Sequence, residues 1–444
     1  MDFKRSAAAV AASAILFYFG TGYAPVAALT WLAPLPILLL ARTSTAWTAT
    51  VSAFLAFLLG TANAWPLQLR SHDTPLIPVG LMIDVGMALT FTAAVWVFHR
   101  LRDRPLLAAL VTPATWTALI YLVSVANPMG MQGNFANEQG DFALLLRTAS
   151  VTGMWGIEFL VLFVPAAIAV LRLRIAAAAL GVLVLALALG AIRPKDGPVQ
   201  RVAAIATNQH AWAPNIGTQA GRDLLDTYVS AIAGLPDGVT TVVLPEQSFS
   251  GSEPRPAFDP LERLAKARGL TIVMGYAYLD DREKYNYALT FPDRGSYLKH
   301  HDMVSPPGHD LVFAAQGIGV EICLDVNHTS PARDYAKAGS RILAIPASDE
   351  GDNGWQHSRV ALLRAAEHGQ AVVWSDRTGE VMIADGWGRV RASAHSGGEG
   401  PVTTLVADVA SPGSTAYTDI GDWFAWICVA GAIGANVRTK VRQA

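Results

Sequence analysis

The 444-residue chain has little charge and little cysteine. Charged residues make up 15% of it, well below the roughly 25% of ordinary soluble domains, whereas hydrophobic residues make up 52%. This composition argues against a purely soluble protein. A formal net charge of -2 is not the basic excess of nucleic-acid-binding proteins, so no nucleic-acid partner is expected. Two cysteines are too few for a disulfide framework.

The shortage of charge is uneven along the chain. Residues 1–192 are mostly long apolar runs, residues 193–410 have an ordinary globular composition, and residues 411–444 become apolar again. We predict a transmembrane bundle of seven spans, one water-facing domain, and a final span with a short tail, because each membrane helix needs about 20 apolar residues. The predicted spans lie near 6–22, 23–41, 46–63, 76–98, 105–126, 151–171, 175–192 and 420–437. The first could instead be a signal peptide, because basic residues precede it.

Lysine and arginine in the short loops predict the orientation in the membrane, since cytoplasmic loops carry the excess. The opposite loops hold only Arg70 and Arg147. The basic set of loop ends holds Lys4, Arg5, Arg42, Arg100, Arg102, Arg104, Arg172, Arg174, Arg438, Lys440 and Arg442. We therefore predict a multi-pass protein of the cytoplasmic (inner) membrane, with both termini inside and residues 193–410 on the outer, periplasmic face.

Strand-like and helix-like segments alternate in the water-facing domain. The expected strands are Val199–Thr207, Thr240–Pro245, Thr271–Tyr278, Gly317–Cys323, Arg341–Ala347 and Ala371–Ser375. The expected helices are Gln219–Gly234, Leu261–Arg268 and Gln356–His368. Such alternation predicts a layered α/β domain.

Three residues at the ends of strand-like segments carry groups suited to acyl transfer. Cys323 ends one such segment, Glu246 directly follows another, and Lys299 ends a third. A thiol needs a nearby base or cation to become nucleophilic, and a base, a cation and a thiol together can perform covalent acyl chemistry. A lone cysteine can equally be a small core residue, and a lone glutamate or lysine a surface residue.

The short sequence motifs around these residues, termed words below, resemble those of the nitrilase (carbon–nitrogen hydrolase) superfamily. In chain order they are VLPE at 243–246, YNYA at 285–288, YLK at 297–299, EICLD at 321–325, and the stretch from Trp355-Gln356-His357 to Glu367. Seven spans before the domain and one after it resemble the apolipoprotein N-acyltransferases of that superfamily. The stretches 25–40 and 152–160 also resemble that family's second and sixth spans.

This resemblance implies an α-β-β-α sandwich and a role for each matching residue. Glu246 would be the general base and Cys323 the nucleophile. Lys299 and the backbone N–H of Leu324 would stabilise the oxyanion, and Asp325 would orient the site. The implied reaction moves an acyl chain from a phospholipid through a thioester to the α-amine of a lipoprotein or another lipid-linked amine. It requires no cofactor and no metal, and we expect a membrane-bound monomer.

Other residues are expected to support the site or to contact substrate. Asn286, within the second word, is a supporting residue. His309 stands where the family has a glutamate, so a negative charge near Lys299 is missing. Trp212 and Glu158 are candidate substrate contacts, although Trp212 could simply pack under a loop and Glu158 could simply be solvated near the end of its span. Asp84 is expected to pair with a polar group in the bundle.

Two further functions stay open. Only 23 residues separate Lys299 from Cys323, fewer than the family norm, and the stretch 348–354 departs from the family pattern. A shortened lid favours a membrane-anchored amidase, because a thioester that is poorly shielded from water is open to hydrolysis. A binding or transport scaffold without activity is the third candidate. Transport predicts broken polar spans in paired halves, which this sequence does not display.

Overall fold

The structure is a computed structural model that describes residues 2–71, 75–192, 196–207, 213–349, 351, 353–396 and 400–441. The chain divides into two compact units. The first comprises Met1–Ala126, Gly133–Ile192 and Ile420–Ala444, and the second comprises Asn127–Gln132 and Arg193–Asp419. The second unit thus includes a short stretch from the predicted bundle, which we term the 127–132 segment, and it extends beyond the predicted domain end at residue 410.

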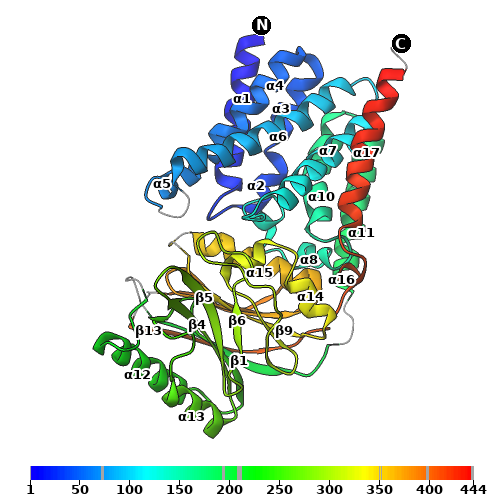
Figure 1. Cartoon of the computed structure of the whole chain (residues 1–444). Coiled ribbons are helices and arrows are strands. Elements are labelled where there is room, and N and C mark those ends of the chain that lie inside the picture. Colours follow the sequence, from blue (N-terminus) through cyan, green and yellow to red (C-terminus); the bar gives the residue numbers. More distant parts are fainter. Residues whose placement is uncertain are drawn as a thin grey trace. The chain divides into compact units, whose positions relative to one another are not determined.

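The first unit is helical, and its helices can be followed by label in Figure 1. Long apolar sequences favour helices because a helix pairs all of its backbone groups internally. The main helices are α1 (Asp2–Gly20), α2 (Ala27–Leu32), α3 (Leu35–Thr43), α4 (Ala46–Gly60), α6 (Leu81–Arg100), α7 (Pro105–Ala126), α10 (Met154–Ala169), α11 (Leu173–Ala191) and α17 (Trp423–Val441). Shorter helices are α5 (Trp65–Gln68), α8 (Ala143–Leu146), α9 (Ala149–Thr152) and α16 (Ala416–Ile420), the last beginning in the second unit.

Several of these helices are long and apolar enough to cross a membrane. Within the described part of the chain, four qualify by length and composition: Ala46–Gln68, Leu76–Arg100, Pro105–Ala126 and Leu173–Ala191. A fifth candidate joins Ala143–Thr152 to Met154–Ala169 through a 119° bend. Helix occurs at each of the eight predicted places, but two of the helices there, Ala27–Thr43 and Trp423–Gly434, are shorter apolar segments. The number of eight spans stays a prediction.

The two carboxylates that the sequence analysis names in the first unit are buried and hydrogen-bonded. Glu158 on α10 accepts hydrogen bonds from Trp116 Nε1 at 2.7 Å and from the backbone N–H of Ala136 at 2.7 Å. Asp84 on α6 accepts from Trp65 Nε1 at 2.9 Å, as the expected pairing with a polar group requires. Because Glu158 is fully buried, the interpretation that it is solvated is wrong. Its contact with substrate stays a prediction.

The second unit contains two β-sheets. The seven-stranded sheet has the order β13-β1-β2-β4-β5-β6, with β3 paired to β4, and the six-stranded sheet has the order β12-β11-β10-β9-β8-β7. The strands of the first sheet are β1 (Gln200–Thr207), β2 (Val239–Val243), β3 (Phe249–Gly251), β4 (Thr271–Leu279), β5 (Lys284–Phe291), β6 (Ser296–Leu298) and β13 (Val402–Val409). Those of the second are β7 (Phe313–Ala315), β8 (Ile318–Val320), β9 (Ile342–Ala347), β10 (Ala371–Asp376), β11 (Glu380–Ala384) and β12 (Val390–His395).

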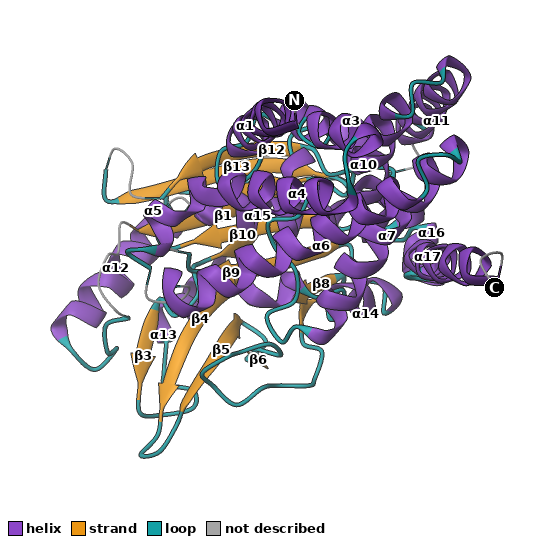
Figure 2. Cartoon of the chain, turned by 90° about the horizontal axis from the view of Figure 1, so that it is seen from above, coloured by secondary structure: helices purple, strands orange, loops and turns teal. Residues whose placement is uncertain are grey.

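Helices cover the outer face of each sheet, so the unit is an α-β-β-α sandwich, as predicted. On the seven-stranded sheet, α12 (Gln219–Ala233) and α13 (Asp259–Arg268) bury Tyr228 and Leu261 in a core shared with β2 and β4. These helices and the strands beside them can be followed in Figure 2. The six-stranded sheet packs against α14 (Ala332–Lys337) and α15 (Asn353–His368). Between the sheets, Ser375 Oγ on β10 donates to the backbone oxygen of Ile205 on β1 at 3.0 Å.

One predicted strand is wrong at the residue that matters most. The expected strand Gly317–Cys323 is ordered as β8 only over Ile318–Val320, and Cys323 begins a short 3-10 helix, η4 (Cys323–Asn327). The residues after β8, Glu321 and Ile322, stay buried although they are outside the strand, and the apolar residues on either side of Glu321 suggest a longer strand. Parallel pairing of β1–β2, β2–β4, β8–β9 and β9–β10 places several strand ends at one edge of the sandwich, where functional side chains commonly gather.

Candidate active site

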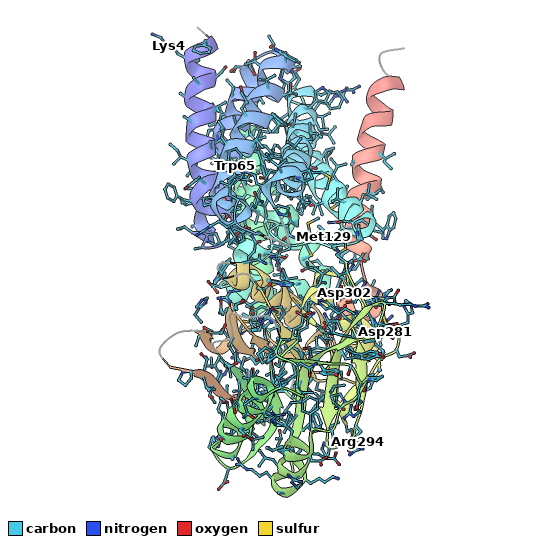
Figure 3. The ribbon with its side chains drawn as sticks, turned by 60° about the vertical axis from the view of Figure 1, so that its left-hand side comes forward. Lys4, Trp65, Met129, Asp281, Arg294 and Asp302 are labelled. Atoms are coloured by element: carbon cyan, nitrogen blue, oxygen red, sulfur yellow. The ribbon has the colours of Figure 1, made fainter. Side chains whose placement is uncertain are left out.

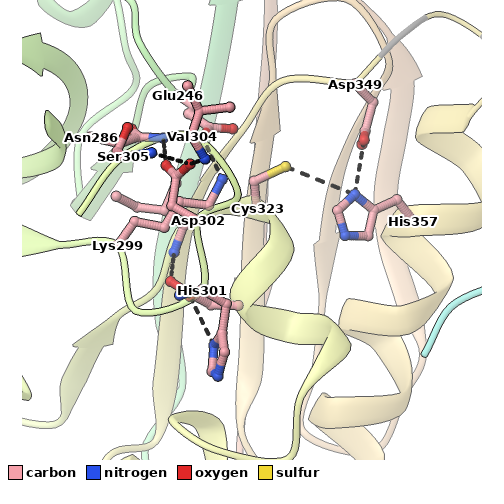
Figure 4. A network of polar contacts seen from close by, with 12 residues as sticks. Glu246, Asn286, Lys299, His301, Asp302, Val304, Ser305, Cys323, Asp349 and His357 are labelled. Atoms are coloured by element: carbon pink, nitrogen blue, oxygen red, sulfur yellow. Dashed lines mark hydrogen bonds and ion pairs between the residues drawn. The ribbon is translucent and has the colours of Figure 1, made fainter. Parts of the chain in front are cut away.

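The structure brings Glu246, Lys299 and Cys323 together at these strand ends (Figure 4). Glu246 follows β2, Lys299 directly follows β6, and Cys323 follows β8. All three are buried, with exposed fractions of 4%, 7% and 6%. Lys299 Nζ donates to Glu246 Oε1 at 2.8 Å. A base, a cation and a thiol from three separate strands therefore share one buried site.

Glu246 is held by contacts on both its side chain and its backbone. Asn286 Nδ2, on β5, donates to Glu246 Oε1 at 2.6 Å and also contacts Asp302 Oδ2 at 3.1 Å. The backbone N–H of Glu246 donates to the backbone oxygen of Ala347 at the end of β9. The backbone of Glu246 also lies close to β4. This closeness requires a glycine at position 275, because a Cβ there would lie 2.4 Å from the Cα of Glu246. Asn286 is thus hydrogen-bonded to Glu246, and its supporting role stays a prediction.

Lys299 remains a cation in this buried position. Burial by itself would lower the pKa of Lys299, but Glu246 and Cys323, followed by Asp302, outweigh burial and raise that pKa. Asp302 is a carboxylate for a related reason: burial would raise its pKa, whereas Lys299 and backbone N–H groups, among them that of Val304, lower it. The site therefore holds a permanent positive charge beside Glu246.

Cys323 sits in a strained turn and is a protonated thiol at rest. Its φ of 43° lies in the left-handed region that side chains other than glycine rarely adopt. Burial, followed by the charges of Glu246 and Asp349, raises the pKa of the Cys323 thiol well above its usual value, despite the opposing effect of Lys299. Since the thiolate is the nucleophile, the thiol proton must pass to a neighbouring base when Cys323 reacts.

Asp325 links the turn at Cys323 to the end of β6. Its Oδ1 accepts from the backbone N–H of His301 at 2.7 Å, and its Oδ2 accepts from Tyr297 Oη at 2.7 Å and from the backbone N–H of Ile322 at 3.0 Å. Because Lys299 lies between Tyr297 and His301, these contacts fix the lysine and the cysteine relative to each other. The orienting role expected for Asp325 stays a prediction.

The 127–132 segment is hydrogen-bonded to the same turn. Asn327, the last residue of η4, donates from Nδ2 to the backbone oxygen of Met129 at 3.1 Å and accepts from the backbone N–H of Met131 at 3.1 Å. Gln132 Nε2 donates to Asn353 Oδ1, at the start of α15, at 2.6 Å. Met129 and Asp302 are both labelled in Figure 3. The segment therefore contacts the elements on either side of Cys323, a contribution that the sequence does not predict.

The remaining predicted residues have different surroundings. His309 is exposed, and its ring lies 6.5 Å from that of His300, which stacks on Tyr297. Leu324 follows the nucleophile within η4. Trp212 lies outside the described residues. Glu158 belongs to the first unit, as described above.

A second buried pair faces Cys323 and carries no role in the sequence interpretation. His357 on α15 contacts Asp349 Oδ1 through Nδ1 at 2.8 Å, and the same nitrogen lies 3.9 Å from Cys323 Sγ. The ligand-type atoms of the three residues lie within 4.8 Å of one another, a grouping that could also hold a metal ion. His357 stands inside the word Trp355-Gln356-His357, so the resemblance marks its position without indicating its contact with the nucleophile.

Both parts of the chain resemble known protein families. Residues 201–418 match the carbon–nitrogen hydrolase family, and residues 13–167 match the apolipoprotein N-acyltransferase N-terminal domain. An apolipoprotein N-acyltransferase of Geobacter metallireducens is 31% identical over 119 residues, which are 26% of this chain and 22% of that protein. One from Pasteurella multocida is 25% identical over 258 residues, 48% of each chain.

Among solved structures, an amidase from Nesterenkonia is 16% identical with a TM-score of 0.39, over 50% of this chain and 92% of the amidase. The matched regions of the two acyltransferases span less than half of their length.

Proposed function

We propose that this chain, an apolipoprotein N-acyltransferase-like protein of the carbon–nitrogen hydrolase superfamily, transfers an acyl group through a thioester on Cys323 to a lipid-linked amine. The observation that carries the proposal is the buried Lys299–Glu246 pair beside the thiol of Cys323. A hydrolase-type site joined to an N-acyltransferase-type helical region favours substrates that stay in the bilayer. The proposed chemistry uses side chains alone, so it requires no cofactor or metal.

In the first half-reaction Glu246 acts as the general base. It takes the thiol proton as the sulfur of Cys323 attacks the ester carbonyl carbon of a phospholipid. The carbonyl oxygen becomes an oxyanion, which the ammonium of Lys299 and the backbone N–H of Leu324 stabilise by about 3 kcal/mol per donor. Glu246 then gives its proton to the departing alkoxide of the lysophospholipid. The acyl–oxygen bond is broken, and the acyl–sulfur bond is formed.

In the second half-reaction an amine takes the place of the lysophospholipid. The neutral α-amine of a diacylglyceryl-cysteine lipoprotein attacks the thioester carbonyl carbon, and Lys299 again stabilises the oxyanion. The carbon–sulfur bond breaks, and the amine proton passes through Glu246 to the sulfur of Cys323. The products are an amide and the original thiol, so one base serves both steps.

The setting proposed for this reaction follows the loop charges. The catalytic unit would lie on the outer face of the inner membrane, where exported lipoproteins have their amines, and the enzyme would act as a monomer. Alkaline phosphatase fused at Gly197 should be active, and a fusion after Gln443 should be inactive. The reverse pattern would contradict this orientation.

Mass spectrometry of the purified full-length protein tests the proposed activity. After incubation with phospholipid vesicles, we expect one acyl adduct on the peptide that contains Cys323. A lipoprotein-like peptide with a free α-amine should remove the adduct and become acylated itself. No adduct on Cys323, under conditions where the protein remains folded, would refute the thioester mechanism.

A membrane-anchored amidase is the second candidate, and the same experiment distinguishes it. Two observations favour it: the match of residues 201–418 to carbon–nitrogen hydrolases and the short connection of 23 residues between Lys299 and Cys323. If water resolves the thioester, the adduct disappears at the same rate with and without the amine peptide. If transfer is the function, the amine accelerates its loss and appears in the product.

A further inference from the structure

The sulfur of Cys323 has two kinds of polar neighbour in the site. Glu246 and Lys299 form one pair, linked to each other at 2.8 Å. Asp349 and His357 form the other, also linked at 2.8 Å, with His357 Nδ1 at 3.9 Å from the sulfur. Figure 4 shows Glu246 and His357 on opposite sides of Cys323. The mechanism described above uses the first pair only.

The position of the proton in the second pair follows from the geometry. An ionised carboxylate accepts hydrogen bonds and donates none, so the 2.8 Å contact places an N–H on Nδ1 of His357, pointing toward Asp349 Oδ1. Burial lowers the pKa of His357 to about 4, and Asp376 opposes that shift only in part. His357 is therefore a neutral imidazole near pH 7, with its proton on the nitrogen that faces both Asp349 and Cys323.

Asp349 is itself held in place. Its backbone N–H donates to Asp376 Oδ1 at 3.0 Å, and Asn353 Nδ2 donates to its Oδ1 at 3.2 Å. The ring of His357 packs edge-on against Trp374 with 5.0 Å between centroids. These contacts fix the direction of the Nδ1–H bond. Burial still raises the pKa of the Cys323 thiol well above its usual value, and a hydrogen bond with the backbone of Ser348 opposes that rise only in part.

We propose that His357 is a further catalytic residue, which stabilises the thiolate of Cys323 through its Nδ1–H, and that Asp349 is the residue that positions it. The inference rests on the proposed thioester chemistry. When Cys323 is a neutral thiol or a thioester, the Nδ1–H of His357 donates its hydrogen bond to Asp349 only. When sulfur carries negative charge, as it does while attacking or leaving, the same N–H is shared with the sulfur. No proton is transferred in this step, and only the hydrogen bond of Nδ1–H changes.

This assignment gives the two pairs different tasks. Lys299 is already bonded to Glu246, and its charge faces the oxyanion in the proposed reaction. His357 instead donates a hydrogen bond to the sulfur, which becomes negatively charged in both half-reactions. A hydrogen bond to a charged group contributes more than one between neutral groups, so His357 should matter most when the thiolate is the leaving group.

The pH dependence of alkylation at Cys323 tests the proposal without any acyl substrate. The full-length protein is treated with iodoacetamide over a range of about pH 6 to 10 in the presence of EDTA, and modification is read by peptide mass spectrometry, since only the thiolate reacts. His357→Leu should raise the apparent pKa of the Cys323 thiol by about one to two units, and so slow alkylation of Cys323 near pH 7 by roughly 10- to 100-fold. His357→Asn, whose amide nitrogen can replace Nδ1, should recover most of the rate.

The groups that face Cys323 and His357 are kept constant in this comparison: Glu246, Lys299, Asp349 and Asp376. A separate variant, Asp349→Asn, keeps an oxygen that accepts from Nδ1–H but removes a charge that raises the pKa of the Cys323 thiol, so its profile should not shift upward. His368→Leu is the matched control. His368 is a second buried histidine of α15, bonded to Thr418 and removed from the thiol, and its loss should leave the profile unchanged.

Three outcomes would overturn the proposal. Equal profiles for wild type and His357→Leu would show that the thiolate does not use this donor. Equal shifts for His357→Leu and His368→Leu would indicate a structural effect only. The third outcome would assign Cys323, Asp349 and His357 to a metal site. In that case added Zn²⁺ slows alkylation of the wild type, EDTA reverses the slowing, and His357→Leu is not slowed. In EDTA, the pH profile of His357→Leu is then the same as that of the wild type. If alkylation shifts as expected but no acyl adduct forms, the proposed function fails and the thiolate contact stands.

Discussion

Replacing Lys299 by methionine removes the cation beside Glu246 and leaves the carboxylate in place. The two groups lie 2.8 Å apart, with side-chain exposed fractions of 9% and 5%. Removing one partner of a buried ion pair costs about 3–5 kcal/mol, because the other charge remains buried without compensation. For a domain of this size, 1 kcal/mol corresponds to about 2–4 °C of melting temperature, so Lys299→Met should lower the Tm by roughly 6–20 °C.

The stabilisation that this substitution removes does not depend on pH in the neutral range. In the wild type the pKa of Lys299 is raised, because Glu246 and its neighbours outweigh burial. The stabilisation from a base with a raised pKa is fully present below its unfolded value of about 10.4, so it stays constant between about pH 6 and 9.

A double variant separates the structural effect from the catalytic one. In Glu246→Gln/Lys299→Met no charge is left to bury, so most of the lost stability should return. Acyl-adduct formation should stay absent, since both the base and the oxyanion cation are missing. Thermal unfolding of the purified full-length protein near pH 5 and pH 8 measures the first effect, and mass spectrometry of Cys323 measures the second. The reasoning fails if the single variant is as stable as the wild type, or if the double variant is no more stable than the single one.

The remaining predictions concern the thiols, the 127–132 segment and one buried acid. Cys323→Ala should abolish acyl-adduct formation, whereas Cys428→Ala, in the first unit, should nearly preserve it by the same mass spectrometric assay. Gly130→Ala should slow adduct formation at least several-fold, because φ is +66° and a Cβ would lie 2.5 Å from the backbone oxygen at the end of η4; Gly238→Ala, with φ of +84° and open space, is the control. Glu321→Gln should raise the Tm near pH 8 but change it little near pH 4, because burial raises the pKa of this fully buried carboxyl and such a group destabilises the fold increasingly as the pH rises; equal Tm gains at both pH values would contradict this.

Much of the sandwich could be predicted from the sequence, because its central strands are continuous apolar runs. The predicted strands at 199–207 and 271–278 match β1 and β4 closely. The strands β12 and β13 lack such a signal, and both are half-exposed along much of their length. Local composition therefore indicates the centres of the two sheets better than their edges.

The site also has residues that could be predicted from the sequence and contacts that could not. Glu246, Lys299 and Cys323 are recognisable because each stands in a distinctive word next to a strand, and strand ends meet at one edge. The contact of His357 with Cys323 depends on how α15 packs, and the contact of Met129 with Asn327 joins residues 198 positions apart. Neither leaves a local pattern, because packing over such separations is set by the whole fold.

Backbone strain explains why this site needs its particular neighbours. Two residues other than glycine adopt left-handed φ values here, Gln247 at 48° and Cys323 at 43°. Each such conformation costs about 1–3 kcal/mol and persists only when surrounding contacts impose it. Gly275 allows the turn at Gln247 to approach β4, and Asp325 accepts the backbone N–H that precedes Cys323. These neighbouring residues therefore hold the turn that follows Glu246 and the turn at Cys323 in conformations that Gln247 and Cys323 would rarely adopt alone, so the placement of the thiol depends on the packing around both turns.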